Sequence, residues 1–199
     1  MVRVRKKIKE PMVICICGMA GSGKSTVAKR LAEKYGLKYC SGGDALKALA
    51  EEGLGYKSLK HGWWETEKGM RFLEKREKNP KFDEAVDKKL LELAKHGNVV
   101  LDSWTMPWLL KKGFKIWLEA SPENRAKRIA NRDKTSVKEA LKALREKEER
   151  TKAIYKKLYG FSLGEDFKPF NLILDTGNLK AEEVFQVLCN VIDNVIVNS

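Results

Sequence analysis

The fold is decided by the stretch Gly18-Met-Ala-Gly-Ser-Gly-Lys-Ser-Thr26. An apolar run at residues 12–17 precedes it, and apolar residues at helical spacing follow it between residues 27 and 35. The order strand, glycine loop, helix is that of a P-loop, and the stretch satisfies G-x-x-x-x-G-K-[ST]. A chance glycine-rich turn is the alternative, and the position between a strand and a helix argues against it.

Each residue type in this loop suits phosphate binding. Glycines let the backbone approach an anion closely, and the N–H groups at the start of the following helix then face the phosphates. Lys24 can reach the outer phosphates, and the Ser25 hydroxyl can join a Mg²⁺ ion. The cofactor-binding residues that the loop predicts are Gly18, Ala20, Gly21, Ser22, Gly23, Lys24, Ser25 and Thr26.

Length and charge narrow the class of protein. The chain has 199 residues, enough for one domain with a substantial core. Lys and Arg outnumber Asp and Glu by 40 to 27, and the net charge of +13 leaves nucleotides, nucleic acid and anionic membrane open as partners. No apolar run approaches the ~20 residues of a membrane span, and the basic start lacks the apolar region of a signal peptide. We expect a cytoplasmic protein without a membrane partner.

Four further strands are predicted, at residues 37–40, 98–102, 114–118 and 171–175. Helical patterns separate the strands along the chain, so the sheet should be parallel with right-handed crossovers. The fold class is therefore α/β, with three layers and a five-stranded parallel sheet flanked by helices. Residues 53–79 are the least regular part, and we interpret them as an inserted lobe in which packing of Trp63 and Trp64 is favoured over base stacking.

Several acidic residues are candidate ligands. Asp102 ends the strand at residues 98–102, where open parallel sheets bind ligands, so Ser25 and Asp102 are the predicted metal residues. Asp83 and Asp87 are four residues apart and share one side of a helix, where they face either solvent or a cleft. Asp44, with Ser41, opens the next helix as a cap or as a substrate contact.

Three arginines form a stripe on another helix. Arg125, Arg128 and Arg132 are spaced by three and four residues, which brings them to one face just before the loop at residues 133–136. The alternative is that the three arginines form a solvated surface without a ligand. We favour phosphate contact by at least one of the three, since the planar guanidinium fork suits phosphate.

In this order the motifs resemble those of the P-loop nucleoside monophosphate kinases, and most closely the short archaeal-type cytidylate kinases. The resemblance covers roughly residues 12–192 and includes the P-loop, the turn at 41–44, the proline and two aspartates of 80–87, the helix at 121–132 and the closing segment 171–183. It implies a single kinase domain over 1–199, with a core at 12–40, 97–132 and 170–197, an acceptor-binding lobe at about 41–96, and a lid with its long helix at about 132–160.

The same resemblance implies roles for individual residues. Phosphoryl transfer from ATP with Mg²⁺ would be carried by Lys24, Arg128 and Arg132, while Arg125 would lie against the donor phosphate or adenine. The implied acceptor contacts are Ser41, Asp44, Lys47, Asp83, Asp87 and Trp104.

The acceptor half departs from the family pattern. Lys47 and Trp104 stand where the family commonly has arginine. Lys47 keeps the positive charge but loses the bidentate geometry of a guanidinium, and Trp104 replaces the guanidinium by an aromatic ring. In the long helix, Lys147 and Ile154 also replace frequent arginines, and Arg145 and Arg150 are the candidates to substitute for them. The acceptor site is therefore atypical, whereas the donor half matches.

Three functions follow, in order of preference. The first is ATP-dependent phosphorylation of a nucleoside monophosphate, with CMP or dCMP foremost, by a monomeric enzyme. The second is a P-loop kinase of a different small acceptor, suggested by Trp104. The third is a P-loop ATPase associated with nucleic acid, suggested by the charge of +13 but without any motif of a known nucleic-acid-binding module.

Overall fold

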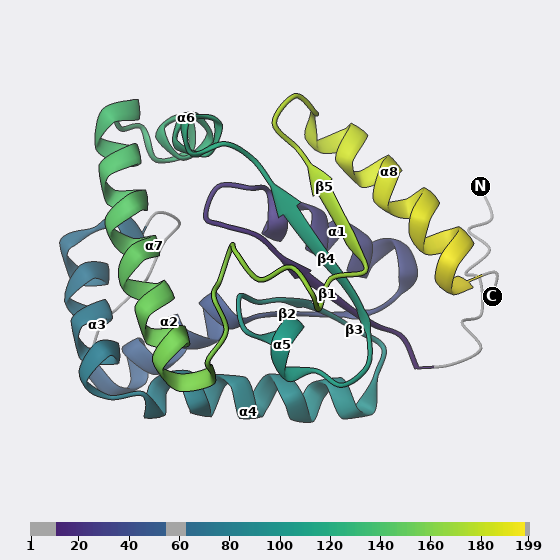
Figure 1. The fold of residues 1–199 in the computed structure, drawn as a ribbon, viewed down its shortest axis with the longest axis horizontal. Helices are drawn as coiled ribbons and strands as arrows, with labels where there is room; N and C mark the ends of the chain where they lie inside the picture. Colours follow the sequence, from purple (N-terminus) through teal and green to yellow (C-terminus); the bar gives the residue numbers. More distant parts are fainter. Residues whose placement is uncertain (1–10, 55–62, 198–199) are drawn as a thin grey trace.

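A five-stranded parallel sheet forms the centre of the molecule (Figure 1). The computed structural model describes residues 11–54 and 63–197. The strand order is β2-β3-β1-β4-β5, and every neighbouring pair is parallel. The strands are β1 Val13–Cys17, β2 Lys38–Ser41, β3 Val99–Asp102, β4 Phe114–Glu119 and β5 Leu172–Asp175. The predicted fold class is confirmed.

Helices cover both faces of this sheet. Along β1, Ile14 and Ile16 pack with α1 and α8 on one face, while Cys15 packs with α2, α4 and α5 on the other. Helices α2, α3 and α7 stand together at one side of the sheet, away from α8 (Figure 1). The helices are α1 Lys24–Tyr35, α2 Gly42–Leu54, η1 Trp63–Glu65, α3 Glu67–Lys78, α4 Lys81–His96, α5 Met106–Leu109, α6 Pro122–Asp133, α7 Val137–Tyr159, α8 Ala181–Ile192 and the π-helical η2 Asp193–Val197.

Two helix boundaries and one short helix were not predicted from the sequence. Helix α2 begins at Gly42, because the Ser41 hydroxyl accepts a hydrogen bond from the Asp44 N–H at 3.1 Å and caps the first turn. The short helix α5 was not predicted, since a single turn leaves no periodic pattern. The last helix, expected to run to residue 197, gives way at Asp193 to the π-helical turn η2.

Helices α6 and α7 form a hairpin with well-defined ends. Ser121 caps α6 and Ser136 caps α7, and Glu139 completes a capping box with Ser136. The turn between the two helices uses Lys134 at a φ of 58°. Apolar residues on the facing sides, including Ile129 of α6, hold the two helices together. This hairpin brings α7 alongside the carboxyl end of the sheet (Figure 1).

The four cysteines are unpaired thiols. Cys15, Cys17 and Cys189 are buried, and burial raises the pKa of Cys17 to about 12. The three buried cysteines pack as small apolar side chains.

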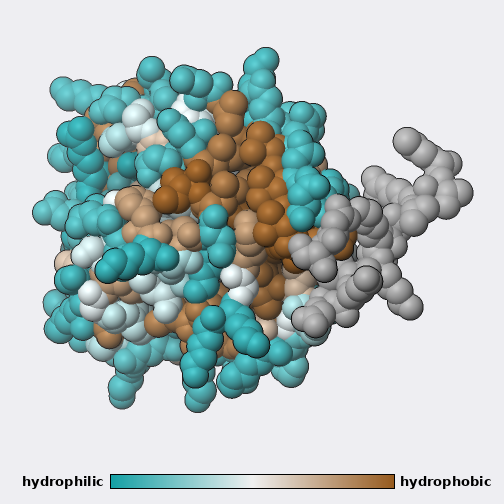
Figure 2. All heavy atoms as spheres, turned by 45° about the vertical axis from the view of Figure 1, so that its right-hand side comes forward, coloured by the Kyte–Doolittle hydropathy of each residue, from teal (hydrophilic) through white to brown (hydrophobic). Residues whose placement is uncertain are grey.

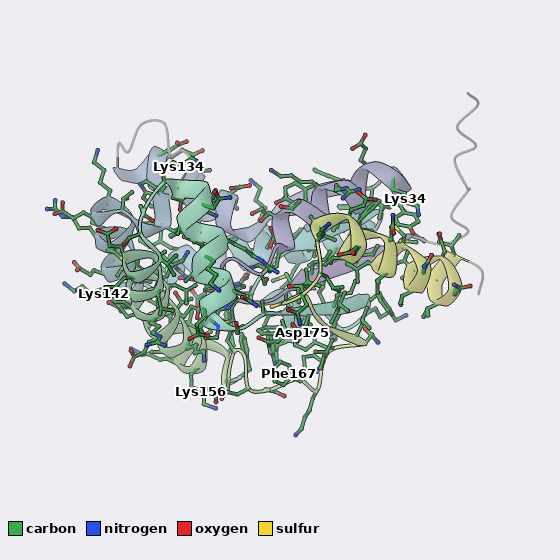
Figure 3. The ribbon with its side chains drawn as sticks, turned by 90° about the horizontal axis from the view of Figure 1, so that it is seen from above. Lys34, Lys134, Lys142, Lys156, Phe167 and Asp175 are labelled. Carbon is green, nitrogen blue, oxygen red and sulfur yellow. The ribbon has the colours of Figure 1, made fainter. Side chains whose placement is uncertain are left out.

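Two surface features are visible in the remaining views. Apolar side chains gather on the side that carries α8, where Val187 and Val195 are exposed (Figure 2). Basic side chains are spread widely instead, and Lys134, Lys142 and Lys156 lie at the outside of the α6 and α7 region (Figure 3). Within residues 11–54 and 63–197, no helix is long and apolar enough to cross a membrane.

Candidate active site

The glycine loop is held tightly between β4 and α6. Gly18, Gly21 and Gly23 all have positive φ, at 141°, 79° and 95°. A Cβ atom at Gly18 would lie 2.3 Å from the Leu118 carbonyl oxygen, and one at Gly21 would lie 2.8 Å from the Arg125 carbonyl oxygen. Only glycine fits these two positions, whereas Gly23 is favoured by its positive φ alone, since a Cβ there would meet no atom within 4 Å. No side chain caps the start of α1 at Gly23, so the first turn of α1 is open to an anion.

Lys24 lies folded against the loop. Its Nζ donates to the Met19 carbonyl oxygen at 2.9 Å and lies 5.7 Å from the centre of the Trp104 ring. Desolvation lowers the pKa of Lys24, and the Asp102 carboxylate opposes that shift. The ammonium is thus a cation in a partly dry site, where its charge acts more strongly than in water.

Ser25 and Asp102 come together, as the sequence predicted for a metal site. The Ser25 hydroxyl donates to Asp102 Oδ2 at 2.5 Å, and the Tyr39 hydroxyl donates to the same oxygen at 3.3 Å. A hydroxyl and a carboxylate beside a phosphate loop fit Mg²⁺, which takes its other ligands from water and phosphate. No cluster of three or more His, Cys, Asp or Glu side chains in the described part of the chain offers a competing metal site.

Two cavities meet at the P-loop. The first, of about 210 Å³, extends from the loop toward α2, α3, α4 and α7. The second, of about 600 Å³, lies between the loop, α6 and the start of α8. Both are lined by Gly21, Lys24, Ser25, Ile129 and Arg132. Two ligands could therefore approach each other across this shared wall.

The residues predicted to bind the acceptor all line the first cavity, namely Ser41, Asp44, Lys47, Asp83, Asp87 and Trp104. The Lys47 ammonium forms an ion pair with the Asp44 carboxylate at 3.7 Å. The Trp104 indole donates to the Gly18 carbonyl oxygen at 2.7 Å and so joins the first cavity to the P-loop.

Arg76 is one of the residues of this cavity that sequence reasoning missed. It is 3% exposed, and its guanidinium donates to both oxygens of Asp83 at 3.1 and 2.6 Å and to the Tyr155 hydroxyl at 3.3 Å. The available signal was its place three residues after Leu73, on the apolar face of α3.

The expected substitutes lie elsewhere in the structure. Arg150 pairs with Glu77 through two bonds of 2.7 Å, and Arg145 is an exposed side chain 3.8 Å from Glu123. Neither lines either of the two cavities. The additional guanidinium of the first cavity therefore comes from α3 of the lobe rather than from α7.

Asp87 has an unusual environment. Its carboxylate accepts hydrogen bonds from Thr105 at 2.5 Å and from Tyr159 at 2.6 Å. Burial nevertheless raises its pKa to about 6, because desolvation outweighs these two bonds and the nearby Asp83 adds repulsion.

The three arginines of α6 have three different environments. Arg125 is buried against Glu148 and donates to the Ala20 and Ala120 carbonyl oxygens at 3.0 Å each. This differs from the expected contact with donor phosphate or adenine, because the guanidinium is engaged within the protein and lines neither cavity. Arg128 lines the second cavity and donates to Thr176 Oγ1 at 3.1 Å. Arg132 alone of the three lines both cavities and pairs with Asp133 at 2.6 Å.

Two tryptophans, Trp64 and Trp104, line the first cavity. The Lys147 ammonium lies 5.4 Å from the Trp64 ring centre and 5.9 Å from the Trp104 ring centre. Trp63 instead packs in the interior, 5.8 Å from the Phe72 ring centre, so only one of the adjacent tryptophans lines the cavity. Lys147 thus connects α7, the lobe and the segment after β3.

The site combines a glycine loop and its lysine with a hydroxyl and carboxylate pair, and two cavities meet at this loop. These features define the site of a P-loop phosphotransferase. A model of the cytidylate kinase-like family matches residues 13–178. The cytidylate kinase of Pyrococcus horikoshii is 35% identical over 191 residues, covering 94% of this chain and 91% of its own length. That of Methanocaldococcus jannaschii is 35% identical over 192 residues, covering 92% and 99%. The chain belongs to the cytidylate kinase-like family.

Solved structures agree on the fold. Shikimate kinase from Bacteroides thetaiotaomicron has a TM-score of 0.56 at 18% identity, covering 92% of this chain and 98% of its own. Shikimate kinase from Acinetobacter baumannii, in complex with shikimate, has a TM-score of 0.54 at 19% identity, covering 94% and 96%.

Proposed function

We propose that this protein transfers a phosphoryl group from ATP to a nucleoside monophosphate, with CMP or dCMP as the acceptor. The observation that carries the proposal is the pair of cavities that share Lys24, Ser25 and Arg132. Phosphoryl transfer requires two anionic ligands in line, with cations at the point where they meet. Family membership and the names of the relatives support cytidylate as the acceptor.

The chain's own residues divide the work. The donor phosphates would lie on the P-loop N–H groups, and Lys24 would leave the Met19 carbonyl to reach the transferred group. Arg132 would leave Asp133 and contact the phosphates where the two cavities meet. Arg128, beside Thr176, would contact the donor phosphates. Arg125 would act indirectly, by fixing the loop through Ala20.

Magnesium would be held by Ser25 and, directly or through water, by Asp102, and it would neutralise charge on the donor phosphates. Water must be excluded, since ATP would otherwise be hydrolysed. Movement of the α6 and α7 hairpin over the two cavities would provide that exclusion. We further propose a monomeric enzyme of the cytoplasm.

A coupled assay with ATP, Mg²⁺ and a panel of CMP, dCMP, UMP, AMP and GMP tests the function. We expect CMP or dCMP to have the highest kcat/KM. The proposal is wrong if none of the five is phosphorylated faster than ATP is hydrolysed without acceptor. A nucleic-acid-stimulated ATPase would instead respond to added RNA or DNA with a steep dependence on salt.

A further inference from the structure

Thr151 is a buried residue of the first cavity to which the sequence assigned no role. It lies on α7, is 1% exposed, and lines the cavity together with residues of the P-loop, α2, α3 and α4. Its Oγ1 has no hydrogen-bond partner among residues 11–54 and 63–197.

This lack of a partner is unusual for a helical threonine. Such a hydroxyl ordinarily donates to the carbonyl oxygen four residues earlier, which would be that of Lys147. Thr151 makes no such bond. A buried hydroxyl without a partner costs free energy, and folded proteins carry few of them. Because this one is on a cavity wall, a ligand in the cavity can supply the missing partner.

The neighbours of Thr151 on α7 define a stripe of hydrogen-bond donors. Lys147, Thr151 and Tyr155 are spaced by four residues, so they share one face of the helix, and all three line the cavity. Tyr155 accepts a bond from Arg76 and, within the described part of the chain, donates none. The hydroxyls of Thr151 and Tyr155 therefore have protons to offer to oxygen atoms of a ligand.

The position along α7 indicates which part of the ligand Thr151 would meet. Lys147 is next to Trp104, which is bonded to the P-loop, so that end of the stripe is the phosphate end. At the other end of the stripe, Tyr155 meets the buried pair of Arg76 and Asp83. Thr151 is one helical turn, about 6 Å, from Lys147. It therefore faces the sugar and base of an acceptor rather than its phosphate.

We propose that Thr151 is a specificity-determining residue whose hydroxyl donates a hydrogen bond to an oxygen of the acceptor's nucleoside part. That oxygen is either a sugar hydroxyl or the carbonyl of the pyrimidine. This inference rests on the proposed function, since it takes a nucleoside monophosphate as the occupant of the first cavity.

The test compares wild type, Thr151→Val and Thr151→Ser in three measurements. These are steady-state kinetics with CMP and with dCMP, calorimetric binding of CMP to the full chain, and thermal unfolding without nucleotide. Valine has nearly the shape of threonine but no hydroxyl, whereas serine retains the hydroxyl.

We expect Thr151→Val to raise the KM for CMP and to weaken CMP binding about 3- to 10-fold, with the KM for ATP unchanged. The Tm without nucleotide should be equal to or above that of wild type, because the variant removes a buried hydroxyl that has no partner. A purely structural role would lower the Tm instead. Thr151→Ser should stay within about twofold of wild type in CMP binding.

The two acceptors identify the oxygen. A loss with CMP alone supports a bond to the 2′ hydroxyl, and an equal loss with CMP and dCMP supports a bond to a group that both contain. A change of less than twofold with both acceptors, in an active wild type, overturns the assignment of Thr151 and leaves the proposed function intact. A wild type that phosphorylates neither CMP nor dCMP nor any other monophosphate of the panel overturns both.

Discussion

The second cavity, which we propose binds the donor phosphates (the donor side), shares a wall with the first, which we propose binds the acceptor (the acceptor side), but the two differ in construction. The donor side is centred on one contiguous stretch, residues 21–27, to which α6, the turn at Thr176 and the start of α8 add side chains from later in the chain. The acceptor side collects side chains from α2, α3, α4, the segment after β3 and α7. The donor side thus has a local backbone loop at its centre, whereas the acceptor side depends mainly on tertiary packing.

The charges of the two sides also differ. On the acceptor side, Arg76 is paired with Asp83 and Lys47 with Asp44, so these cations are already engaged within the protein. Lys24, on the wall that both sides share, makes its hydrogen bond only to a backbone carbonyl, although Arg132 on the same wall is paired with Asp133. The comparison suggests that acceptor recognition depends on a preformed polar network, whereas donor recognition depends on a loop that is open to an anion.

The largest effect is expected from breaking that network. Arg76→Met would leave the buried Asp83 carboxylate without its partner and should lower the free energy of unfolding by about 3–5 kcal/mol. Urea unfolding at neutral pH measures this. Adding Asp83→Leu to the same chain should restore much of the loss, because no charge is then left unpaired. If Arg76→Met alone is as stable as wild type, the ion pair of Arg76 and Asp83 does not stabilise the walls of the acceptor cavity.

A catalytic rather than structural loss is expected at the donor side. Lys24→Ala should lower kcat/KM by about 100- to 1,000-fold, since it removes a cation from the transferred group. Unfolding should change little because Lys24 has few structural contacts. Lys142→Ala, an exposed lysine on α7, is the matched control and should retain wild-type activity. Equal activity of both variants would remove Lys24 from the mechanism.

The raised pKa of Asp87 gives a smaller effect with a defined pH window. The carboxyl keeps its proton to about pH 6 in the folded protein but only to about pH 3.8 in the unfolded chain. Wild type therefore loses stability relative to Asp87→Asn as the pH rises between these values, by on the order of 2–3 kcal/mol. Unfolding of both proteins from pH 4 to pH 7 checks this. A stability difference that stays constant across the window would contradict the raised pKa.

Much of the donor side could be predicted from the sequence because its chemistry is local. The glycine spacing fixes the loop, and the acid that ends β3 is brought beside Ser25 by parallel pairing of β1 with β3. The partners of Arg125 could not be predicted, for the converse reason. Its spacing placed it correctly on α6, but the buried Glu148 that binds it lies 23 residues further along the chain.

The acceptor side was predictable only in part. The spacing of Asp83 and Asp87 indicated that they share one face of a helix. Nothing in the local sequence indicated that Arg76 would donate to Asp83. The hydrogen bonds from Thr105 and Tyr159 to Asp87 were equally unpredictable. Thr151 carries no pattern at all, because a threonine within a charged helix reads as a solvated residue. These contacts join segments that are distant in the sequence, and they follow from packing rather than periodicity.

The ammonium of Lys147 between Trp64 and Trp104 has an optical consequence. The fluorescence of an indole ring responds to a charge held close to it. Since Lys147 is on α7 while the two rings belong to the lobe and to the sheet end, the proposed movement of α7 would shift this charge relative to both rings. The fluorescence of the two indoles would then report that movement without an added label.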